Sequence, residues 1–251
     1  MVSNRWSEQH EVSSDNCDYK RDCRLSTLME WMQRAGDSHL ASHDVSMDEL
    51  VGSGMAWMLL TVDLELMRMP KYGDVLQLDT WHKGARGVQW LRDYVVYDAE
   101  HQQIAQSRTT WALVDLNKRR ILRASAFPYD VPVNNEDSVG EMPEKVAIPE
   151  ESSLRLAYTL HVRQSSIDMN GHLNNARFAD ICLDAMTQEE LERGVSRFRI
   201  TYHKEIILGD QVDVYRSTGE ALHADDRRCF IRGQASDGST LFDAEVVYRE
   251  E

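Results

Sequence analysis

The sequence of 251 residues predicts an α+β protein made of two copies of one unit, each with an antiparallel sheet around a single helix. Three observations lead to this prediction. Each half carries a loop with an aspartate that is followed by an amphipathic helix, and a Gly-Asp turn follows each helix further along the chain. The rest of the chain is rich in strand patterns, and 42% of the residues are apolar, which is enough to bury a sizeable core.

The aspartate loop and its helix repeat at an offset that we place at 153 residues, which aligns Asp15 with Asp168. The i, i+3, i+4, i+7 spacing of apolar residues after each aspartate is one face of a helix. These positions are Leu25, Leu28, Met29 and Met32 in the first half and Phe178, Ile181, Cys182 and Ala185 in the second.

The Gly-Asp turn repeats at an offset of 136 residues, as Gly73-Asp74 and Gly209-Asp210. On these alignments the first copy is 17 residues longer than the second between its aspartate and its turn. We expect the extra residues around Gly36–Gly54, because the Ser, Asp, His and Gly content of that segment suits a loop or lid.

Strand patterns fill both copies, with Val, Thr, Tyr and Trp between turn residues. In the first copy we expect strands at Met55–Met69, Val75–His82, Gln89–Tyr97 and Ile104–Leu116. In the second we expect them at Leu154–Val162, Phe198–Ile207, Gln211–Ser217, Arg228–Gln234 and Leu241–Tyr248. Prolines and acidic residues mark 131–152 as a connector, so the predicted domains are 1–130 and 153–251.

Charge and cysteine content narrow the class of protein. The formal net charge is −14, which argues against nucleic acid and anionic membranes as partners. No apolar stretch reaches the roughly 18 to 20 residues of a membrane span, and the first residues do not have the pattern of a leader, so we expect a cytoplasmic protein. The four cysteines lack disulfide or metal-ligand spacing, so we expect reduced thiols and no metal or other cofactor.

The loop at 168–175 holds the residues best suited to chemistry. Asp168, Asn170 and His172 bring a carboxylate, an amide and an imidazole together ahead of a helix, whose first N–H groups can stabilise an oxyanion. Asp and Asn before a helix are commonly caps, which is the plainer interpretation. However, the offset of 153 pairs Asn170 with Cys17 and His172 with Tyr19, so the amide and imidazole are not needed to build the loop.

Glu205 is a fourth candidate, on the predicted strand before the second Gly-Asp turn. The offset of 136 places it opposite Met69, so an acidic residue in one copy replaces an apolar residue in the other. A glutamate in a strand is ordinarily a solvated surface residue. Glu205 is a functional candidate only if it lies close to the side chains of the loop at 168–175.

Along almost its whole length the chain resembles the acyl-acyl carrier protein thioesterases, the tandem hot-dog family of fatty acid synthesis. In the first half the resemblance rests on Leu28–Glu30, Tyr72–Val75, Asp79–Trp81, Arg92-Asp93, Ser107–Val114 and Lys118–Arg120. In the second half it rests on Asp168, Asn170, His172, Asn174, Asn175 and Glu205. Plant members resemble this last strand but have a cysteine after the glutamate, where this chain has Ile206. That cysteine is the thiol nucleophile of a mechanism proposed for plant members, so its absence argues against a thiol mechanism here. The first residues do not have the pattern of a transit peptide, which favours the bacterial branch of the family.

The resemblance implies a double hot-dog fold and hydrolysis of fatty acyl-carrier thioesters, with release of the free fatty acid. It implies that Asp168, Asn170, His172 and Glu205 form the catalytic site. We assign Glu205 as general base on water, Asn170 to orient water or the carbonyl, and His172 to polarise the thioester. Asp168 either completes the acidic pair or attacks the carbonyl directly.

The resemblance also implies that the first copy holds the acyl chain. Soft methionines and aromatic residues suit a flexible hydrocarbon, although plain core packing explains any single one of them. The expected pocket residues are Met29, Met32, Trp57, Met58 and Met69.

The partner that the resemblance implies is an acyl carrier protein, which is acidic. An acidic enzyme needs a local basic patch to bind it, and the densest one is Lys118, Arg119 and Arg120 at a predicted hairpin turn. Homodimer formation is compatible with the sequence but not required by it.

Three other functions stay open at this point. The first is a thioesterase that acts on acyl-CoA. The second is a hydratase of the same fold, which has Asn-Pro between its Asp and a His five residues on, whereas His172 follows Asp168 by four without a proline. The third is a non-catalytic acyl-binding protein, which predicts a degraded polar cluster in both copies.

Overall fold

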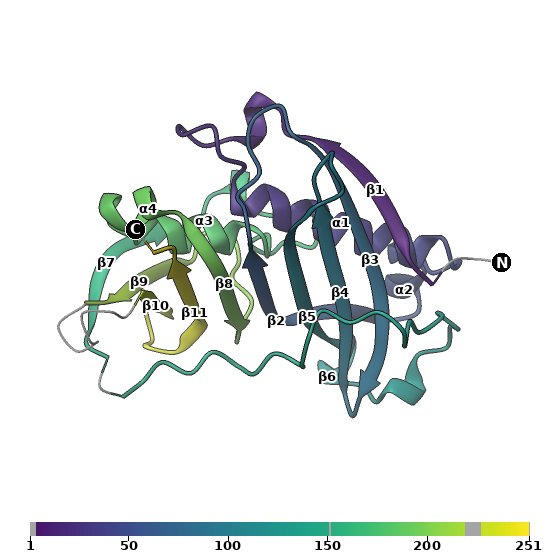
Figure 1. Ribbon diagram of the computed structural model, residues 1–251. Coiled ribbons are helices and arrows are strands. Elements are labelled where there is room, and N and C mark those ends of the chain that lie inside the picture. Colours follow the sequence, from purple (N-terminus) through teal and green to yellow (C-terminus); the bar gives the residue numbers. More distant parts are fainter. Residues whose placement is uncertain (1–3, 151, 219–226, 251) are drawn as a thin grey trace. The chain divides into compact units, whose positions relative to one another are not determined.

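The computed structural model describes residues 4–150, 152–218 and 227–250 (Figure 1). The chain divides into two compact units, Met1–Pro143 and Glu144–Glu251, which we call unit 1 and unit 2. Each unit is an antiparallel sheet with its own helix, so the predicted α+β double hot-dog fold is confirmed.

In unit 1 the sheet runs in the order β1-β3-β4-β5-β2, and the short β6 pairs with β5. Helix α1 contacts β1 and β3 and buries its apolar face, including Leu28, Met29 and Met32. The elements are β1 (Trp6–Glu11), α1 (Leu25–Ala41), α2 (Met47–Gly52), β2 (Met55–Leu66), β3 (Val75–Arg86), β4 (Gln89–Tyr97), β5 (Gln103–Asp115) and β6 (Arg120–Ile121). Two 3-10 turns, η1 (Ser14–Asn16) and η2 (Ala124–Ala126), complete it.

Unit 2 repeats this order as β7-β9-β10-β11-β8. Its helix α3 is shorter than α1 and buries Phe178, Ala179 and Cys182. The elements are β7 (Leu154–His161), η3 (Gln164–Ser166), α3 (Arg177–Asp184), α4 (Gln188–Arg193), β8 (Val195–Tyr202), β9 (Gln211–Ser217), β10 (Arg228–Ala235) and β11 (Thr240–Tyr248).

The loop offset of 153 residues is wrong, and the two loops align at 150. The backbone β-bridge that pairs Cys17 with Cys23 in unit 1 has its counterpart in the β-bridge that pairs Ile167 with Leu173 in unit 2. The 3-10 turn η1 likewise corresponds to η3. The error arose because the two offsets differ by three residues, which is nearly one helical turn. A shift of one turn keeps the apolar face of a helix in place, so helix periodicity could not distinguish them.

The offset of 136 at the Gly-Asp turn is confirmed by hydrogen bonds. The N–H of Cys23 donates to the carbonyl of Pro70 (2.8 Å), and the N–H of Leu173 donates to that of Ile206 (2.7 Å). Glu205 therefore does stand opposite Met69, as predicted. With the corrected loop alignment, unit 1 is longer by 14 residues and not by 17.

The expected loop or lid at Gly36–Gly54 is instead mostly helical. Helix α1 continues to Ala41, and α2 begins after the capping box of Ser46 and Glu49, in which Ser46 Oγ accepts the N–H of Glu49 (3.2 Å). The Ser-x-x-Glu spacing at 46–49 is a helix-start signal in the sequence itself.

Strand positions match the prediction closely, with three instructive differences. Strand β1 was missed, because it is an edge strand of mostly polar residues. Strand β2 ends at Leu66 and β8 at Tyr202, so Met69 and Glu205 lie in the segments after these strands. Each of these segments leaves the sheet to form hydrogen bonds with the loop of its own unit, so the strand pairing ends before Met69 and Glu205.

The expected connector at 131–152 packs against the units. In its first part, the N–H of Asn134 donates to the carbonyl of His82 (2.9 Å) and Lys83 Nζ donates to the carbonyl of Asn134 (2.5 Å), all in unit 1. In its last part, the N–H of Val146 donates to Thr201 Oγ1 (2.9 Å) in unit 2. Within the described residues, no helix is long and apolar enough to cross a membrane.

Candidate active site

The loop at 167–173 of unit 2 is a tight turn held by one carboxylate. Asp168 Oδ1 accepts the N–H of Asn170 (2.8 Å) and that of His172 (3.3 Å), while the N–H of Asp168 donates to the carbonyl of His172 (2.8 Å). Gly171 takes a φ of 82°, which glycine adopts without strain. This turn presents the side chains of Asn170 and His172 at the surface.

Glu205 meets the loop from the segment after β8. Its Oε2 lies 3.5 Å from His172 Nε2, and a bridge between His172 and Ile207 holds the two segments together. The segment is itself braced, because the N–H of Ile207 donates to Asp210 Oδ2 (2.9 Å). The structure thus brings His172 and Glu205 together, although 33 positions separate them in the sequence.

The pair is open to solvent. The side chains of His172 and Glu205 are 36% and 52% exposed, and Asn170 is exposed at the tip of the loop. An imidazole beside a carboxylate, with water at hand, can hold and pass a proton and can orient an attacking water. Asn170 adds an amide that can donate or accept.

The helix does not follow the loop directly. A turn at 174–176 comes first, in which Asn174 Oδ1 accepts the N–H of Ala176 (2.9 Å), and α3 begins at Arg177. Tyr202 anchors this turn, because its hydroxyl donates to the carbonyl of Asn175 (3.0 Å). Sequence reasoning missed Tyr202, whose only signal was its place at the end of the strand before Glu205.

Unit 1 contains the same loop without the same side chains. Asp18 Oδ1 accepts the N–H of Lys20 (2.8 Å) and of Asp22 (3.0 Å), as Asp168 does in unit 2. At the corrected offset, Lys20 takes the place of Asn170 and Asp22 that of His172. The aspartate is therefore common to both loops, whereas the amide, the imidazole and the glutamate belong to unit 2 alone.

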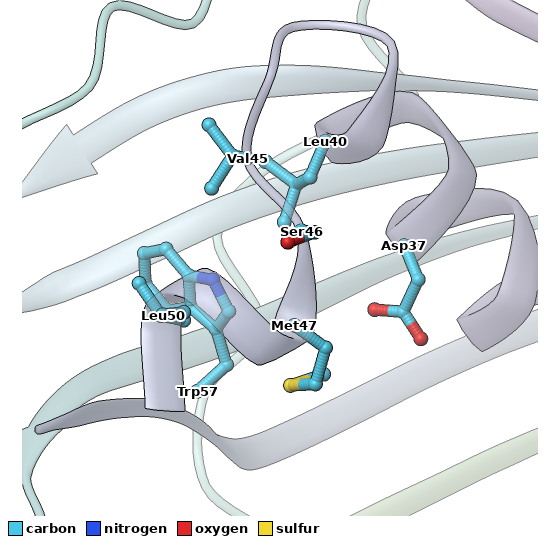
Figure 2. Close-up of a pocket in the computed structure, with 7 residues that line it drawn as sticks. All are labelled: Asp37, Leu40, Val45, Ser46, Met47, Leu50 and Trp57. Atoms are coloured by element: carbon cyan, nitrogen blue, oxygen red, sulfur yellow. The ribbon is translucent and has the colours of Figure 1, made fainter. Parts of the chain in front are cut away.

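The residues expected to line an acyl pocket fall in two groups. Met29 and Met32 are buried on α1, while Trp57, Met58 and Met69 are half-buried on and after β2. Trp57 lines a small recess of about 20 Å³ (Figure 2). The other residues that line it are Asp37, Leu40, Val45, Ser46, Met47 and Leu50.

The four cysteines are buried free thiols. Burial raises the pKa of Cys182 well above its ordinary value and that of Cys23 to about 12, which keeps both thiols protonated and unreactive. In the described part of the chain, no group of three or more His, Cys, Asp and Glu side chains could hold a metal ion.

Lys118, Arg119 and Arg120 lie at the turn from β5 to β6 and are exposed. Asp115 organises this turn, since its Oδ1 accepts the N–H of Lys118 (2.9 Å) and its Oδ2 lies 3.9 Å from Lys118 Nζ. The cluster is a basic surface in unit 1 with one acidic residue within it.

Comparison with known proteins gives consistent matches over both units. The model of the acyl-ACP thioesterase N-terminal domain matches residues 3–126, and that of the C-terminal domain matches residues 150–250. A solved acyl-ACP thioesterase from Bacteroides thetaiotaomicron has a TM-score of 0.87 at 19% identity and covers 98% of both chains. A 12:0-ACP thioesterase from Umbellularia californica has a TM-score of 0.81 at 17% identity and covers 100% of this chain and 96% of its own.

A curated relative, a chloroplastic oleoyl-acyl carrier protein thioesterase from Arabidopsis thaliana, is 22% identical over 234 residues. The match covers 85% of this chain and 64% of the relative. The chain thus spans about three fifths of the length of such curated relatives.

Proposed function

The chain belongs to the acyl-ACP thioesterase family, and from this we propose that it hydrolyses the thioester between a fatty acyl group and acyl carrier protein. The products are the free fatty acid and the carrier thiol, so the reaction ends chain elongation. The observation that carries the proposal is the His172–Glu205 pair at 3.5 Å, on a loop whose counterpart in unit 1 has neither side chain.

In the proposed reaction, Glu205 takes a proton from water and the water oxygen bonds to the thioester carbon. His172 and Asn170 donate hydrogen bonds to the carbonyl oxygen as it becomes an oxyanion. The carbon–sulfur bond then breaks, and the proton returns to the departing thiolate. No cofactor is needed, because water is the only second reactant.

We assign Asp168 to positioning. Its Oδ1 already accepts two N–H groups of the loop, and one of them belongs to His172. Asp18 accepts the equivalent two N–H groups in unit 1, where the loop has no catalytic candidates, so this role is structural. Direct attack on the thioester carbon would require Asp168 to give up these hydrogen bonds.

For unit 1 we propose the acyl-chain pocket, with Met29, Met32, Trp57, Met58 and Met69 among its walls. The recess beside Trp57 supports this; its cavity of about 20 Å³ holds little more than one water molecule, so an acyl chain must move the walls apart to enter it. We propose a cytoplasmic location, which suits four free thiols.

The test is hydrolysis of matched acyl-carrier and acyl-CoA thioesters from short to long chains. We expect turnover, with a higher kcat/KM for the carrier thioester at every length. A higher kcat/KM for the CoA series would identify an acyl-CoA thioesterase, and tight binding without turnover would identify an acyl-binding protein.

A further inference from the structure

The loop of unit 1 that corresponds to the candidate active site carries cations instead of catalytic groups. Lys20, Arg21 and Arg24 come from the loop, and Lys71 comes from the segment that bridges to it at Asp22. We call these four residues the basic loop surface. Their counterparts in unit 2 are the uncharged Asn170, Gly171, Asn174 and Ile207.

Arg21 holds a backbone conformation that suits glycine. Its φ is 67°, while Gly171 at the same place in unit 2 has a φ of 82°. A side chain in this left-handed region costs free energy that glycine does not. Backbone strain that a glycine would relieve is a sign that the side chain itself is useful.

The Arg21 side chain is held outward on an aromatic platform. Its guanidinium carbon lies 4.7 Å from the centre of the Tyr72 ring, which orients the cation without neutralising it. Tyr72 is 49% exposed, and Tyr19, in the same loop as Arg21, is 75% exposed. Exposed tyrosine and arginine together are typical of the residues that dominate binding energy in protein interfaces.

The carboxylates around this surface leave it positive. Asp18 turns its carboxylate into the loop, where Oδ1 accepts two N–H groups. Asp22 lies 3.2 Å from Lys71 and 3.9 Å from Lys20, and Arg24 donates to the carbonyl of the exposed Asp15 (2.8 Å), so the four cations outnumber the three carboxylates around them. In a chain with a net charge of −14, such a surface attracts an acidic partner that the molecule as a whole repels.

We propose that the basic loop surface docks the acidic carrier protein that delivers the acyl group. This inference rests on the proposed function and adds a binding surface to it. Lys118, Arg119 and Arg120 form the competing surface. Arg119 also has a positive φ of 48°, but β6 has no counterpart among the described strands of unit 2 with which to compare that turn.

The test replaces three of the four cations by the residues that unit 2 has in the same loop, in the triple variant Lys20→Asn, Arg21→Gly and Lys71→Ile. These residues are compatible with the loop geometry, and the glycine removes the strain at position 21, so we expect a melting temperature equal to or above that of the wild type. For the acyl-carrier thioester we expect KM to rise about tenfold or more with kcat unchanged, as when attraction at a surface is removed. For the matched acyl-CoA thioester we expect both constants to stay the same.

The matched control replaces Lys118, Arg119 and Arg120 by asparagine, and we expect a smaller rise in KM for the carrier thioester. Titration of the acyl-free carrier protein against the wild type and both variants measures the dissociation constant of docking without any turnover. It therefore separates failure of docking from failure of the proposed function. An unchanged carrier affinity in the loop variant, or a larger loss in the control, overturns the proposal. So does an equal rise in KM for both thioesters.

Discussion

At the scale of single residues, the duplicated loop separates architecture from chemistry. Asp18 and Asp168 accept equivalent pairs of N–H groups, so the aspartate builds the turn wherever it occurs. His172 and Glu205 have no such counterpart and meet at 3.5 Å. The sequence identified all four candidate residues, but the incorrect loop offset hid Asp18 as the partner of Asp168.

We predict that Asp168→Asn retains kcat on an acyl-carrier thioester to within about tenfold, because an amide oxygen can still accept the two N–H groups. Asp168→Ala leaves both unpaired and costs more. Loss of an attacking or proton-transferring carboxylate would instead cost about 10² to 10⁴ in kcat. The measurements are kcat and its pH profile, which we expect Asp168→Asn to leave in place.

Asp18→Asn is the matched control, since it makes the same change in the loop without the candidate residues. We expect its kcat to equal that of the wild type. The positioning role is refuted if Asp168→Asn is as inactive as His172→Ala while remaining folded.

At the scale of elements, the hairpin of β3 and β4 carries a buried imidazole. His82 is 7% exposed and stacks on Trp90, with ring centres 5.4 Å apart. Burial, and next the charge of Arg92, lower its pKa to about 4. Between pH 6.5 and 4 the unfolded chain binds a proton here that the folded chain does not, so the free energy of unfolding falls as the pH falls.

We predict that His82→Phe, which keeps an aromatic ring on Trp90, removes this pH dependence. Relative to the variant, the wild type should lose about 2 kcal/mol of unfolding free energy between about pH 7.5 and pH 5. Urea unfolding at the two pH values measures it. Parallel stability curves for the two proteins would show that His82 does not titrate in this way.

The packing of β10 on β11 leaves no room for a side chain at Gly233, where a methyl group would overlap the ring of Phe242. The centre of that ring lies 5.2 Å from the ring centre of Phe178 of α3, which in turn lies 5.0 Å from that of Tyr202, the residue that anchors the turn after the candidate-site loop. Crowding at this glycine therefore acts on the element that positions the site.

We predict that Gly233→Ala lowers the free energy of unfolding by about 1–3 kcal/mol, as overpacking does. Because Gly233 and Phe242 are in contact, adding Phe242→Leu should recover part of that loss and give a non-additive pair. Thermal or urea unfolding of the two single variants and the double variant checks this. If the losses of the two single variants simply add in the double variant, the strain does not arise from contact between position 233 and Phe242.

Most elements could be predicted, since Gln89–Tyr97 and Gln211–Ser217 were located to the residue. Alternating or continuous β-branched and aromatic residues mark such strands clearly. The edge strand β1 and the short α2 lack that signal, and both could have been found from other evidence. The strand before the loop in the second half implied β1 by repetition, and the capping box at Ser46 implied α2.

At the scale of the molecule, the two units share an architecture and differ in their side chains. The loop with His172 and the segment with Glu205 belong to unit 2, whereas the corresponding loop and segment of unit 1 carry four cations and Met69. Repetition made the fold predictable from sequence, because each copy supports the interpretation of the other. It could not reveal which residues meet across loops, since that depends on the crossing of the segment after β8.

The most direct test of the account is kcat for an acyl-carrier thioester with His172→Ala and Glu205→Gln, next to His203→Ala. His203 is the matched control, because its imidazole is similarly exposed, at 31%, and also lies near a carboxylate, 3.2 Å from Asp243. We predict that the first two variants lose about 10² to 10⁴ in kcat while His203→Ala keeps wild-type turnover. Full activity in both His172→Ala and Glu205→Gln would contradict the account.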